Sequence, residues 1–460
     1  MDASIESLPL IEAGCSRQGP WWDKDPITIH HPPPPSQFSP SFTLGTYIQN
    51  RSTVLSKRRP PRQRSPNDRL LSAQPYRVTM DSNGRPERLE HPYQEELAVA
   101  TSAIRLAATL SQHMIHNKKK GVIHKDDLTP VTIADFAIQA LLCATVKANF
   151  PHDRVVGEEN ASQLRADLLL LEHVYELLQW VVGHGDGPQA EAARAAFPKN
   201  CRVPTSREHM CDLIDECGTS SPAAEGRTWI FDPIDGTKTY IRGEQYAINV
   251  ALLVDGQQAM GAVGCPNMSM KPAVPFVDCH VDGAGTIAFA IKGHGAFVQG
   301  IDGLCAPVRL PPLSPDLTLR DVRFVTCTTV DSALAGVNEA VARDINPAGM
   351  DAYPACDLLP WVLRWVSLAR GLCNTATWVY KSRDRVGKVW DHAGAMLLFE
   401  ETGGHITDVL GRPVDLVTGR KMTSNFGFVA APVHLHGQVL EAVQSVLRAK
   451  GYGALLGDGK

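Results

Sequence analysis

A six-residue segment, Asp-Pro-Ile-Asp-Gly-Thr at residues 232–237, constrains this chain more than any other feature. It follows an apolar run at residues 228–231, which predicts a buried strand that ends at Asp232. The proline fixes φ and the glycine frees it, so the carboxylates of Asp232 and Asp235 can converge on one point. Two bare carboxylates about 4 Å apart repel by roughly 4 kcal/mol at an effective dielectric of ~20. The segment therefore predicts a cation site, and hard oxygen ligands suit Mg²⁺, which in turn suits phosphate.

The composition narrows the class of protein. The chain has 460 residues, of which 43% are hydrophobic and 20% charged, values typical of a globular enzyme with about two or three structural units. A net charge of −4 provides no global basic field for nucleic acid, and no apolar run is long enough for a membrane span. Residues 1–10 lack the pattern of a secretory signal. The 11 cysteines are scattered without a Cys-x-x-Cys pair, which predicts reduced thiols and a cytoplasmic protein.

The chain divides by composition into a tail and two halves. Residues 1–88 hold 13 of the 33 prolines and a basic stretch around Arg58. This composition predicts a disordered Pro/Arg-rich tail, with a targeting signal or a patch for an acidic partner as alternatives. We expect an N-terminal α+β half at residues 89–265 that carries most metal ligands. A C-terminal α/β half at residues 266–460 is expected to carry Asp391 and the substrate-binding segments.

Hydrophobic periodicity predicts the main elements. Apolar residues recur every three or four positions from Leu97 to Met114, which indicates an amphipathic helix. Further helices are expected at residues 133–150, 164–182, 189–196 and 391–402, the last of them beginning at Asp391 and stopped by two glycines. Strands are expected at residues 155–157, 228–231, 247–254 and 260–264. Residues 183–226 read as a polar insertion around the small helix at 189–196.

Acidic residues recur in four separated segments, each at an expected strand end, loop or helix start. The segments hold Asp127 with Asp126 and Asp135, Glu158 with Glu159, Asp232 with Asp235, and Asp391. Taken alone, an aspartate that starts a helix is most often an N-cap, and adjacent acidic residues most often lie in a turn or a solvated pair. Only the segment at 232–237 is informative by itself, so the functional hypothesis rests on all four together.

In this order, the segments resemble those of the lithium-sensitive, magnesium-dependent phosphatase superfamily of inositol monophosphatase. Gly-Glu-Glu at 157–159 resembles its first metal motif, residues 232–237 its second, and Trp-Asp-His-Ala at 390–393 its Trp-Asp-x-Ala motif. The resemblance covers residues 90–440. Within the superfamily, the chain is most similar to the 3′(2′),5′-bisphosphate nucleotidases, through residues 125–135, 155–159, 242–247, 253–256 and 264–267.

The resemblance implies an α/β fold, the layered α-β-α-β-α sandwich of the inositol monophosphatase and fructose-1,6-bisphosphatase type, with an α+β N-terminal half. It implies two or three Mg²⁺ ions as cofactor, with these ligands: Glu158, Asp232, Asp235, Asp391 and the carbonyl of Ile234. Asp127 and Thr237 are implied to be catalytic, because together they orient and deprotonate an attacking water. Thr237 and Asp391 are also implied to contact the substrate.

The implied activity is hydrolysis of the 3′-phosphate of adenosine 3′,5′-bisphosphate, and of 3′-phosphoadenylyl sulfate, by a metal-activated water. Sensitivity to lithium and a place in sulfur assimilation follow from the same resemblance. The expected partner is a small phosphorylated nucleotide or metabolite, with neither nucleic acid nor membrane. Two alternatives stay open: a phosphatase of inositol phosphates or another small phosphorylated metabolite, and a catalytically weak metal-binding or regulatory relative.

The substrate half motivates these alternatives. The nucleotidase branch carries a His-Ser-Ser type segment, a Ser-x-x-Lys-Tyr segment and then an arginine. The corresponding residues here, 325–330, 356–362 and 372–375, lack them. The candidate replacements are the basic residues Arg364, Arg370, Lys381 and Arg383, together with Trp361 or Trp378 to stack on a base. Trp361 and Trp365 also share one helix face, which favours packing in a core.

Overall fold

The computed structural model describes residues 90–119, 130–274, 276–327, 333–352 and 359–458. Asp127 and the expected tail at residues 1–88 lie outside the described residues. So do parts of the expected substrate-binding segments at 325–330 and 356–362. In the part of the chain that is described, no helix is both long enough and apolar enough to cross a membrane.

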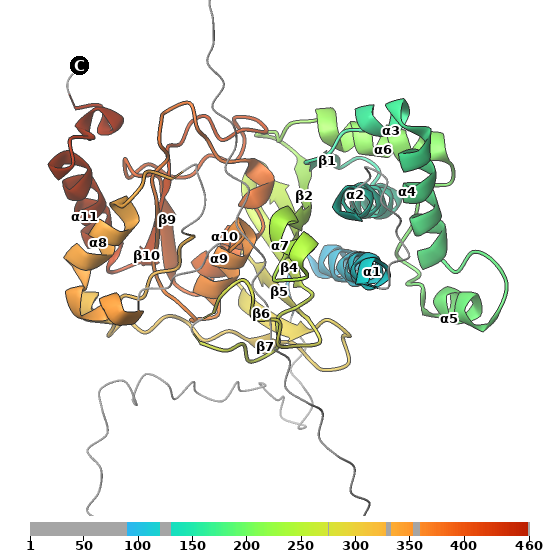
Figure 1. The fold of residues 1–460 in the computed structure, drawn as a ribbon, viewed down its shortest axis with the longest axis horizontal. Coiled ribbons are helices and arrows are strands. Elements are labelled where there is room, and N and C mark those ends of the chain that lie inside the picture. The colour runs from blue at the N-terminus through green and yellow to red at the C-terminus, as the bar shows by residue number, and fades with distance from the viewer. Residues whose placement is uncertain (1–89, 120–129, 275, 328–332, 353–358, 459–460) are drawn as a thin grey trace, which may run out of the picture. The chain divides into compact units, whose positions relative to one another are not determined.

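A seven-stranded sheet carries the N-terminal motifs (Figure 1). Its strands follow one another in chain order: Arg154–Gly157 (β1), Arg227–Asp235 (β2), Ala247–Val254 (β3), Gln257–Cys265 (β4), Thr286–Ile291 (β5), Gly295–Gly300 (β6) and Val308–Arg309 (β7). Strands β1 and β2 pair in parallel, and each later pair is antiparallel. The parallel register sets Gly157 opposite Phe231, so the chain that leaves β1 continues beside Asp232.

Strand β2 continues past the point where the apolar run predicted its end. The expectation that it stops at Asp232 was wrong, because the strand extends to Asp235, which pairs with Ala247 of β3. The register shifts between the two aspartates, and this places an irregularity at Pro233 and Ile234. Proline has no amide for the ladder and is tolerated at bulges. Residues three apart in a regular strand face opposite sides of the sheet, so the bulge lets both aspartates face the same side.

A second, smaller sheet lies in the C-terminal part of the chain. Its strands are Ala376–Trp378 (β8), Gly404–Thr407 (β9) and Phe428–Pro432 (β10), in the order β8-β10-β9. Both pairs are antiparallel.

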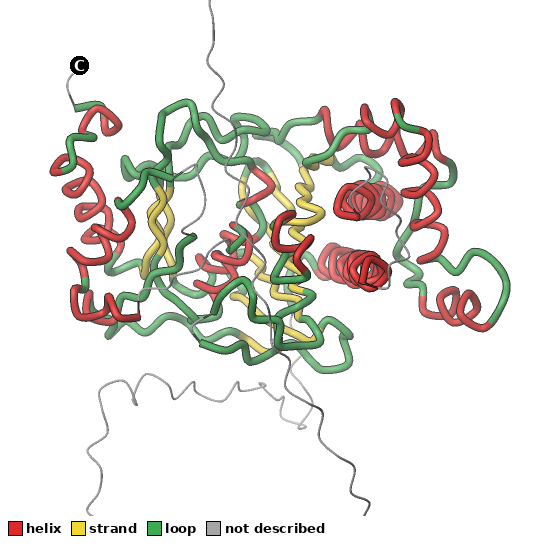
Figure 2. Tube along the Cα trace, viewed as in Figure 1, coloured by secondary structure: helices red, strands yellow, loops and turns green. Residues whose placement is uncertain are grey.

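Helices separate and cover the two sheets (Figure 1, Figure 2). Helices α9 (Trp361–Ala369) and α10 (Ala395–Glu400) lie between the sheets. Helices α8 (Val337–Ile345) and α11 (His436–Ala449) pack together outside the small sheet. Helices α1 (Gln94–Lys119) and α2 (Pro130–Asn149) cover the far face of the large sheet. The layers therefore alternate α-β-α-β-α, and the predicted sandwich is confirmed.

Strand β2 contributes alternate side chains to two hydrophobic cores, one on each face of the large sheet. Trp229 and Phe231 point into the core shared with α1 and α2. Ile230 points into the other core, shared with α9 and α10. The expected boundary after residue 265 falls between β4 and β5, which are paired strands of one sheet, and the division into halves stays a prediction.

Most expected helices are confirmed, and two expectations need correction. Helix α1 includes the predicted apolar stripe, α2 covers residues 133–149, and α5 (Pro188–Ala196) is the small predicted helix. The single helix expected at 164–182 was wrong, because Asp167 divides it into α3 (Ser162–Ala166) and α4 (Leu168–Val181). Asp167 adopts an extended backbone, and its carboxylate caps two amides of the first turn of α4.

The polar insertion holds a further helix that the sequence analysis did not identify. Helix α6 (Arg207–Thr219) begins after Ser206, whose hydroxyl accepts a hydrogen bond from the amide of His209. Its buried residues recur every three or four positions: Met210, Cys211, Leu213, Ile214 and Cys217. A capping serine followed by this spacing is the signal that predicts a helix here. The remaining short helices are Thr237–Arg242 (α7), Leu319–Asp321, Pro347–Ala352 and Gly453–Leu456.

The helix expected to begin at Asp391 was also wrong at its start. Asp391 ends a 3₁₀ turn, Val389–Asp391 (η4), and α10 begins only at Ala395. The side chains of Asn249 in β3 and Gln258 in β4 donate hydrogen bonds to two carbonyls of this stretch. Those carbonyls are the acceptors that a continuous helix would use, so the sheet holds the turn in an irregular form.

At the start of α10, the backbone also comes into direct contact with the backbone of the large sheet. Gly261 of β4 lies so close to Gly394 that a Cβ at position 261 would be 2.1 Å from the Gly394 carbonyl oxygen. No side chain fits in that contact. The distance between the sheet and the segment that carries Asp391 is therefore limited by direct contact between two backbone segments.

Candidate active site

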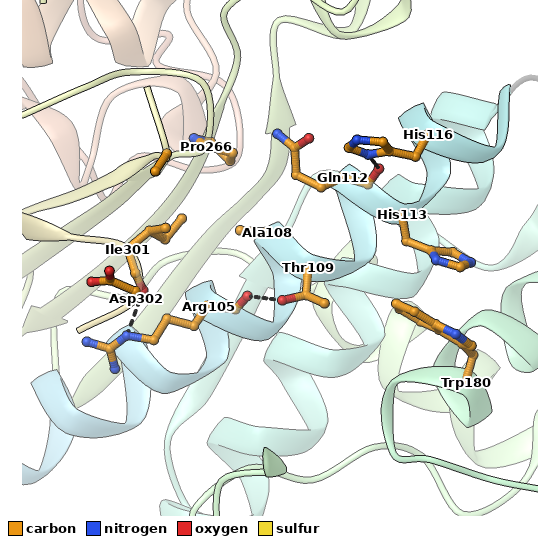
Figure 3. Close-up of a pocket in the computed structure, with 11 residues that line it drawn as sticks. Arg105, Ala108, Thr109, Gln112, His113, His116, Trp180, Pro266, Ile301 and Asp302 are labelled. Carbon is orange, nitrogen blue, oxygen red and sulfur yellow. Dashed lines mark hydrogen bonds between the residues drawn. The ribbon is translucent and has the colours of Figure 1, made fainter. Parts of the chain in front are cut away.

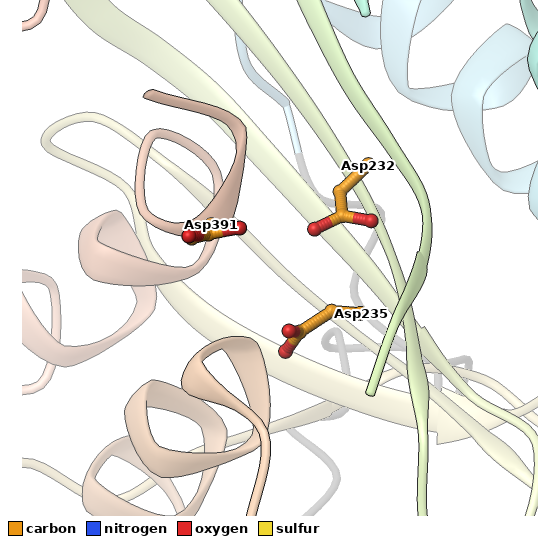
Figure 4. Close-up of side chains that lie close together, drawn as sticks. All are labelled: Asp232, Asp235 and Asp391. Atoms are coloured by element: carbon orange, nitrogen blue, oxygen red, sulfur yellow. The ribbon is translucent and has the colours of Figure 1, made fainter. Parts of the chain in front are cut away.

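Three aspartates from two distant parts of the chain meet in one cluster. Asp232 and Asp235 come from β2, and Asp391 from η4; each offers a carboxylate oxygen, and these oxygens all lie within 4.8 Å of one another (Figure 4). Asp232 is 1% exposed, and the other two are partly buried. The bulge in β2 and the 3₁₀ turn direct the three side chains to this point. Three of the predicted metal ligands are thus brought together, while their role as ligands stays a prediction.

Glu158 borders this cluster from the end of β1. Its side chain is exposed, and its carboxylate is not one of the three within 4.8 Å. Crowding by protein atoms still raises the pKa of Glu158, although the positive charge of Lys388 counteracts that effect. Repulsion from Glu158 contributes to the raised pKa values of Asp232 and Asp391. Its carboxylate is therefore part of the same electrostatic site.

The acidic cluster is electrostatically unfavourable by itself. Burial raises the pKa of Asp232 well above its usual range, and repulsion from the neighbouring carboxylates adds to the shift. Burial also raises the pKa of Asp391 well above normal, and that of Asp235 to about 7. Asp235 is partly compensated, because its Oδ2 accepts a 2.7 Å hydrogen bond from the amide of Val362.

The cluster fits a divalent cation. A buried oxygen of Asp232 has no hydrogen-bond partner among the described residues. Buried polar atoms are normally satisfied, so an orphaned oxygen surrounded by other carboxylates indicates a missing positive charge. All donor atoms of the cluster are oxygens, which hard cations such as Mg²⁺ prefer.

Two more acidic residues extend the site toward α2. Asp135 is buried in that helix, and burial followed by repulsion from Glu159 and Glu158 raises its pKa well above normal. Burial and the charge of Glu158 raise the pKa of Glu159 to about 7. The main chain of Glu159 is held by Gln139, which accepts from its amide at 2.8 Å and donates to its carbonyl at 2.6 Å. Gln139 is a residue that motif reasoning missed, since a lone buried glutamine in a helix carries no sequence signal.

The remaining predicted residues differ in how well the structure places them. Ile234 is buried between the two aspartates of β2, with its side chain in the core. Thr237 is exposed and begins α7, directly after Gly236, whose φ of 96° is left-handed. Asp127 lies outside the described residues. The roles of all three stay predictions.

Comparison with known proteins decides the family. The model of the inositol monophosphatase family matches residues 92–448. The chain belongs to the inositol monophosphatase family. Its similarity to curated members extends over nearly their whole length: it is 34% identical to the 3′(2′),5′-bisphosphate nucleotidase of Emericella nidulans, over 77% of this chain and 99% of the relative. The 3′(2′),5′-bisphosphate nucleotidase of Schizosaccharomyces pombe is 32% identical, over 77% and 96% of the two chains.

Solved structures of family members are also similar. One is the crystal structure of inositol monophosphatase-II from Staphylococcus aureus MSSA476, at 17% identity and a TM-score of 0.48, over 80% of this chain and 100% of that chain.

In this member of the inositol monophosphatase family, the candidate basic residues of the substrate half have internal contacts. The guanidinium of Arg364 lies 4.2 and 4.5 Å from the ring centroids of Trp361 and Trp378, and its Nε donates to the carbonyl of Leu359. Arg370 is buried and donates to two main-chain carbonyls, those of residues 269 and 270. These contacts account for both arginines structurally, and a role in substrate binding stays a prediction.

A cavity of about 530 Å³ is lined by residues other than those of the acidic cluster (Figure 3). It is lined by one face of α1, including Arg105 and His113, together with Trp180 and Asp302. The His113 and Trp180 rings stack at 3.6 Å. None of the predicted site residues within the described ranges lines it. This cavity therefore does not coincide with the catalytic site that the motifs of the inositol monophosphatase family predict.

Proposed function

We propose that this chain is a divalent-cation-dependent phosphomonoesterase that removes the 3′-phosphate of adenosine 3′,5′-bisphosphate. The observation that carries the proposal is the cluster of Asp232, Asp235 and Asp391, with a buried oxygen of Asp232 that lacks a partner among the described residues. The names of relatives from fungi and from Arabidopsis thaliana support the nucleotide substrate, because the chain matches nearly the whole of each. The proposal includes 3′-phosphoadenylyl sulfate, which carries the same 3′-phosphate.

The proposed cofactor is two or three Mg²⁺ ions. Asp232, Asp235 and Asp391 would hold them, with Glu158 closing the set from the end of β1 and Ile234 contributing its carbonyl. When bound, such ions neutralise phosphate charge and acidify water, which makes hydrolysis accessible near neutral pH. Inhibition by Li⁺ is part of the proposal through family membership.

The chain's own residues supply the remaining chemistry. Thr237 is exposed at the start of α7, two residues beyond Asp235, so its hydroxyl is accessible to water. We assign Thr237 and Asp127 to orienting the attacking water and accepting its proton. Asp391 faces β2 from the central helical layer, and with Thr237 it is the proposed contact for the substrate (Figure 4).

A phosphate-release assay on a substrate panel tests the proposal. The panel holds adenosine 3′,5′-bisphosphate, 3′-phosphoadenylyl sulfate, and inositol mono- and bisphosphates, each with Mg²⁺ and with excess EDTA. We expect the 3′-phosphorylated nucleotides to be hydrolysed fastest, and turnover to stop in EDTA. Full turnover in EDTA contradicts the metal assignment. Faster phosphate release from inositol phosphates than from the nucleotides would show that an inositol phosphate is the substrate. Near-zero release from every compound, with Mg²⁺ binding intact by calorimetry, identifies a binding or regulatory relative.

A cytoplasmic location and a place in sulfur assimilation belong to the same proposal. Every cysteine among the described residues is a free thiol, the state that a reducing compartment maintains. Cell fractionation with an antibody to the native chain tests the location.

A further inference from the structure

The side chain of Arg420 binds the main chain at the end of β1. Its Nη2 donates to the carbonyls of Gly157, at 2.6 Å, and Glu158, at 3.2 Å. Its Nη1 donates to the carbonyls of Cys217, at 2.9 Å, and Ser220, at 3.1 Å, at the C-terminal end of α6. One guanidinium therefore ties the acidic segment at residues 157–159 to the end of a helix, where a cation is also favoured by the helix dipole. The planar fork of arginine suits this task, because it directs its donors to two sites at once.

Arg420 also holds the segment that carries Asp391. The Arg420 guanidinium lies 4.8 Å from the centroid of the Trp390 ring. The main-chain carbonyl of Arg420 accepts a 3.1 Å hydrogen bond from the amide of Val389. Trp390 directly precedes Asp391 in η4. The Arg420 guanidinium thus contacts the Trp390 ring, one residue before Asp391, and also donates a hydrogen bond to the carbonyl of Glu158.

Gln139 is a second residue that holds the segment at 157–159. Gln139 binds the amide and the carbonyl of Glu159, and it approaches so closely that a Cβ at Gly157 would be 2.6 Å from its side-chain oxygen. Gly157 therefore runs in a narrow space with Gln139 on one side. Arg420 supplies the contact that fixes this segment to the C-terminal part of the chain.

We propose that Arg420 is a positioning residue that holds Glu158 and Asp391 in register with each other and thereby sets the affinity of the acidic cluster for Mg²⁺. This inference rests on the proposed function, since it assigns a task to a residue of the same site. Residues that orient metal ligands from outside the coordination sphere typically change metal affinity or activity by about 10- to 100-fold when replaced.

The alternative is that Arg420 acts only through its charge, and the two ideas predict opposite signs. A positive charge beside a cation site weakens cation binding, so its removal alone should tighten Mg²⁺ binding. Loss of positioning should weaken it. Lys388 is the matched control, because its ammonium lies 5.0 Å from the same Trp390 ring and it makes no hydrogen bond to residues 157 and 158 in the described structure.

The test measures Mg²⁺ binding to the full chain by titration calorimetry, and the Mg²⁺ concentration that gives half-maximal phosphate release. We compare the wild type with Arg420→Gln, Arg420→Lys and Lys388→Gln. We expect Arg420→Gln to weaken Mg²⁺ binding by about 10- to 100-fold, with activity recovering at high Mg²⁺, as expected for an outer residue of a metal site. Lys388→Gln should bind Mg²⁺ as tightly as the wild type or more tightly. Arg420→Lys keeps the charge without the fork, so it should also weaken binding.

Other results overturn the inference. Wild-type Mg²⁺ affinity in Arg420→Gln, or equal shifts of one sign in Arg420→Gln and Lys388→Gln, would show that Arg420 does not position the ligands. If Arg420→Gln fails to fold by circular dichroism, Arg420→Lys decides: weakened binding supports positioning, and wild-type binding refutes it. A wild-type chain that binds no Mg²⁺ defeats the proposed function itself, whereas an active wild type with an unaffected Arg420→Gln defeats only this inference.

Discussion

Two buried aspartates show what separates a structural carboxylate from one that requires a cofactor. Asp408 is 0% exposed, and each of its oxygens is satisfied: Oδ1 accepts from the amides of Leu410 and Arg412, and Oδ2 accepts from the Arg412 guanidinium at 2.9 and 2.6 Å. Asp232 is 1% exposed, faces other carboxylates and keeps one oxygen without a partner among the described residues. Burial of an acid is therefore no functional signal by itself. The signal is burial without compensation from the protein.

The largest expected effect is the loss of activity when Asp232, the uncompensated aspartate, is replaced. Asp232→Asn removes a charged oxygen from the proposed cation site, and it should lower kcat by about 100- to 1,000-fold, the scale of a lost preorganised electrostatic contact. The same change relieves repulsion in the cluster, so the variant should unfold in EDTA at a temperature no lower than the wild type. Phosphate-release kinetics and thermal unfolding measure the two quantities. Wild-type kcat in this variant would contradict the role of Asp232.

Asp408→Asn should have the opposite profile. It removes the charged acceptor of Arg412, whose side chain is half exposed, and the two lost charge-assisted hydrogen bonds cost about 1.5 kcal/mol each, or about 3 kcal/mol together. We expect that loss in the free energy of unfolding by urea, with kcat per folded molecule unchanged. A large fall in kcat with stability retained would show that the two aspartates do not differ in kind.

Mg²⁺ should stabilise the chain through one of the two regions only. A ligand that binds the folded state at 100 times its dissociation constant adds about 2.7 kcal/mol to the free energy of unfolding. We expect an increment of this size for the wild type and for Asp408→Asn, and a smaller one for Asp232→Asn. Urea titrations with Mg²⁺ and with EDTA give the increments. Equal increments in all three proteins would place the ion elsewhere.

The smallest expected effect concerns a buried ionisable group outside the cluster. Burial, and then the charge of His405, lower the pKa of His436 to about 4, while its Nε2 lies 3.2 Å from the carbonyl oxygen of Val429. Because the pKa of His436 is lower in the folded state, the unfolded state binds the proton first as the pH falls. The contribution of neutral His436 to the free energy of unfolding is therefore fully present above the unfolded pKa of about 6.5 and is lost as the pH falls toward 4. Between pH 6.5 and 5.5 the loss should be about 1 kcal/mol. His436→Gln should flatten this part of the stability profile, and an unchanged slope would contradict the assignment.

Local sequence patterns were enough to predict much of the fold and the residues of the acidic cluster. The layered sandwich, the helix stripe of α1 and the membership of the inositol monophosphatase family were predicted from the sequence and are confirmed. The nucleotidase branch is likewise the one whose members the chain matches over nearly their full length. Periodicity and motif order are properties of neighbouring residues, so one sequence reveals them.

The remaining features depend on contacts between distant residues. The bulge that extends β2 to Asp235 follows from pairing with β3, and the 3₁₀ turn at Asp391 follows from hydrogen bonds with the sheet. Nothing near Val362 in the sequence indicates that its amide binds Asp235. Helix α6 is different, because its cap and its spacing were visible and were read as a polar insertion.

The backbone contact between Gly261 and Gly394 leaves the layer that carries Asp391 no room to adjust. A single methyl group at position 261, in the middle of an ordinary strand, would act as a wedge and lift the third aspartate away from the other two. Substitution of Gly261 should accordingly be poorly tolerated, although this glycine carries no side chain, because the spacing between the two layers depends on it.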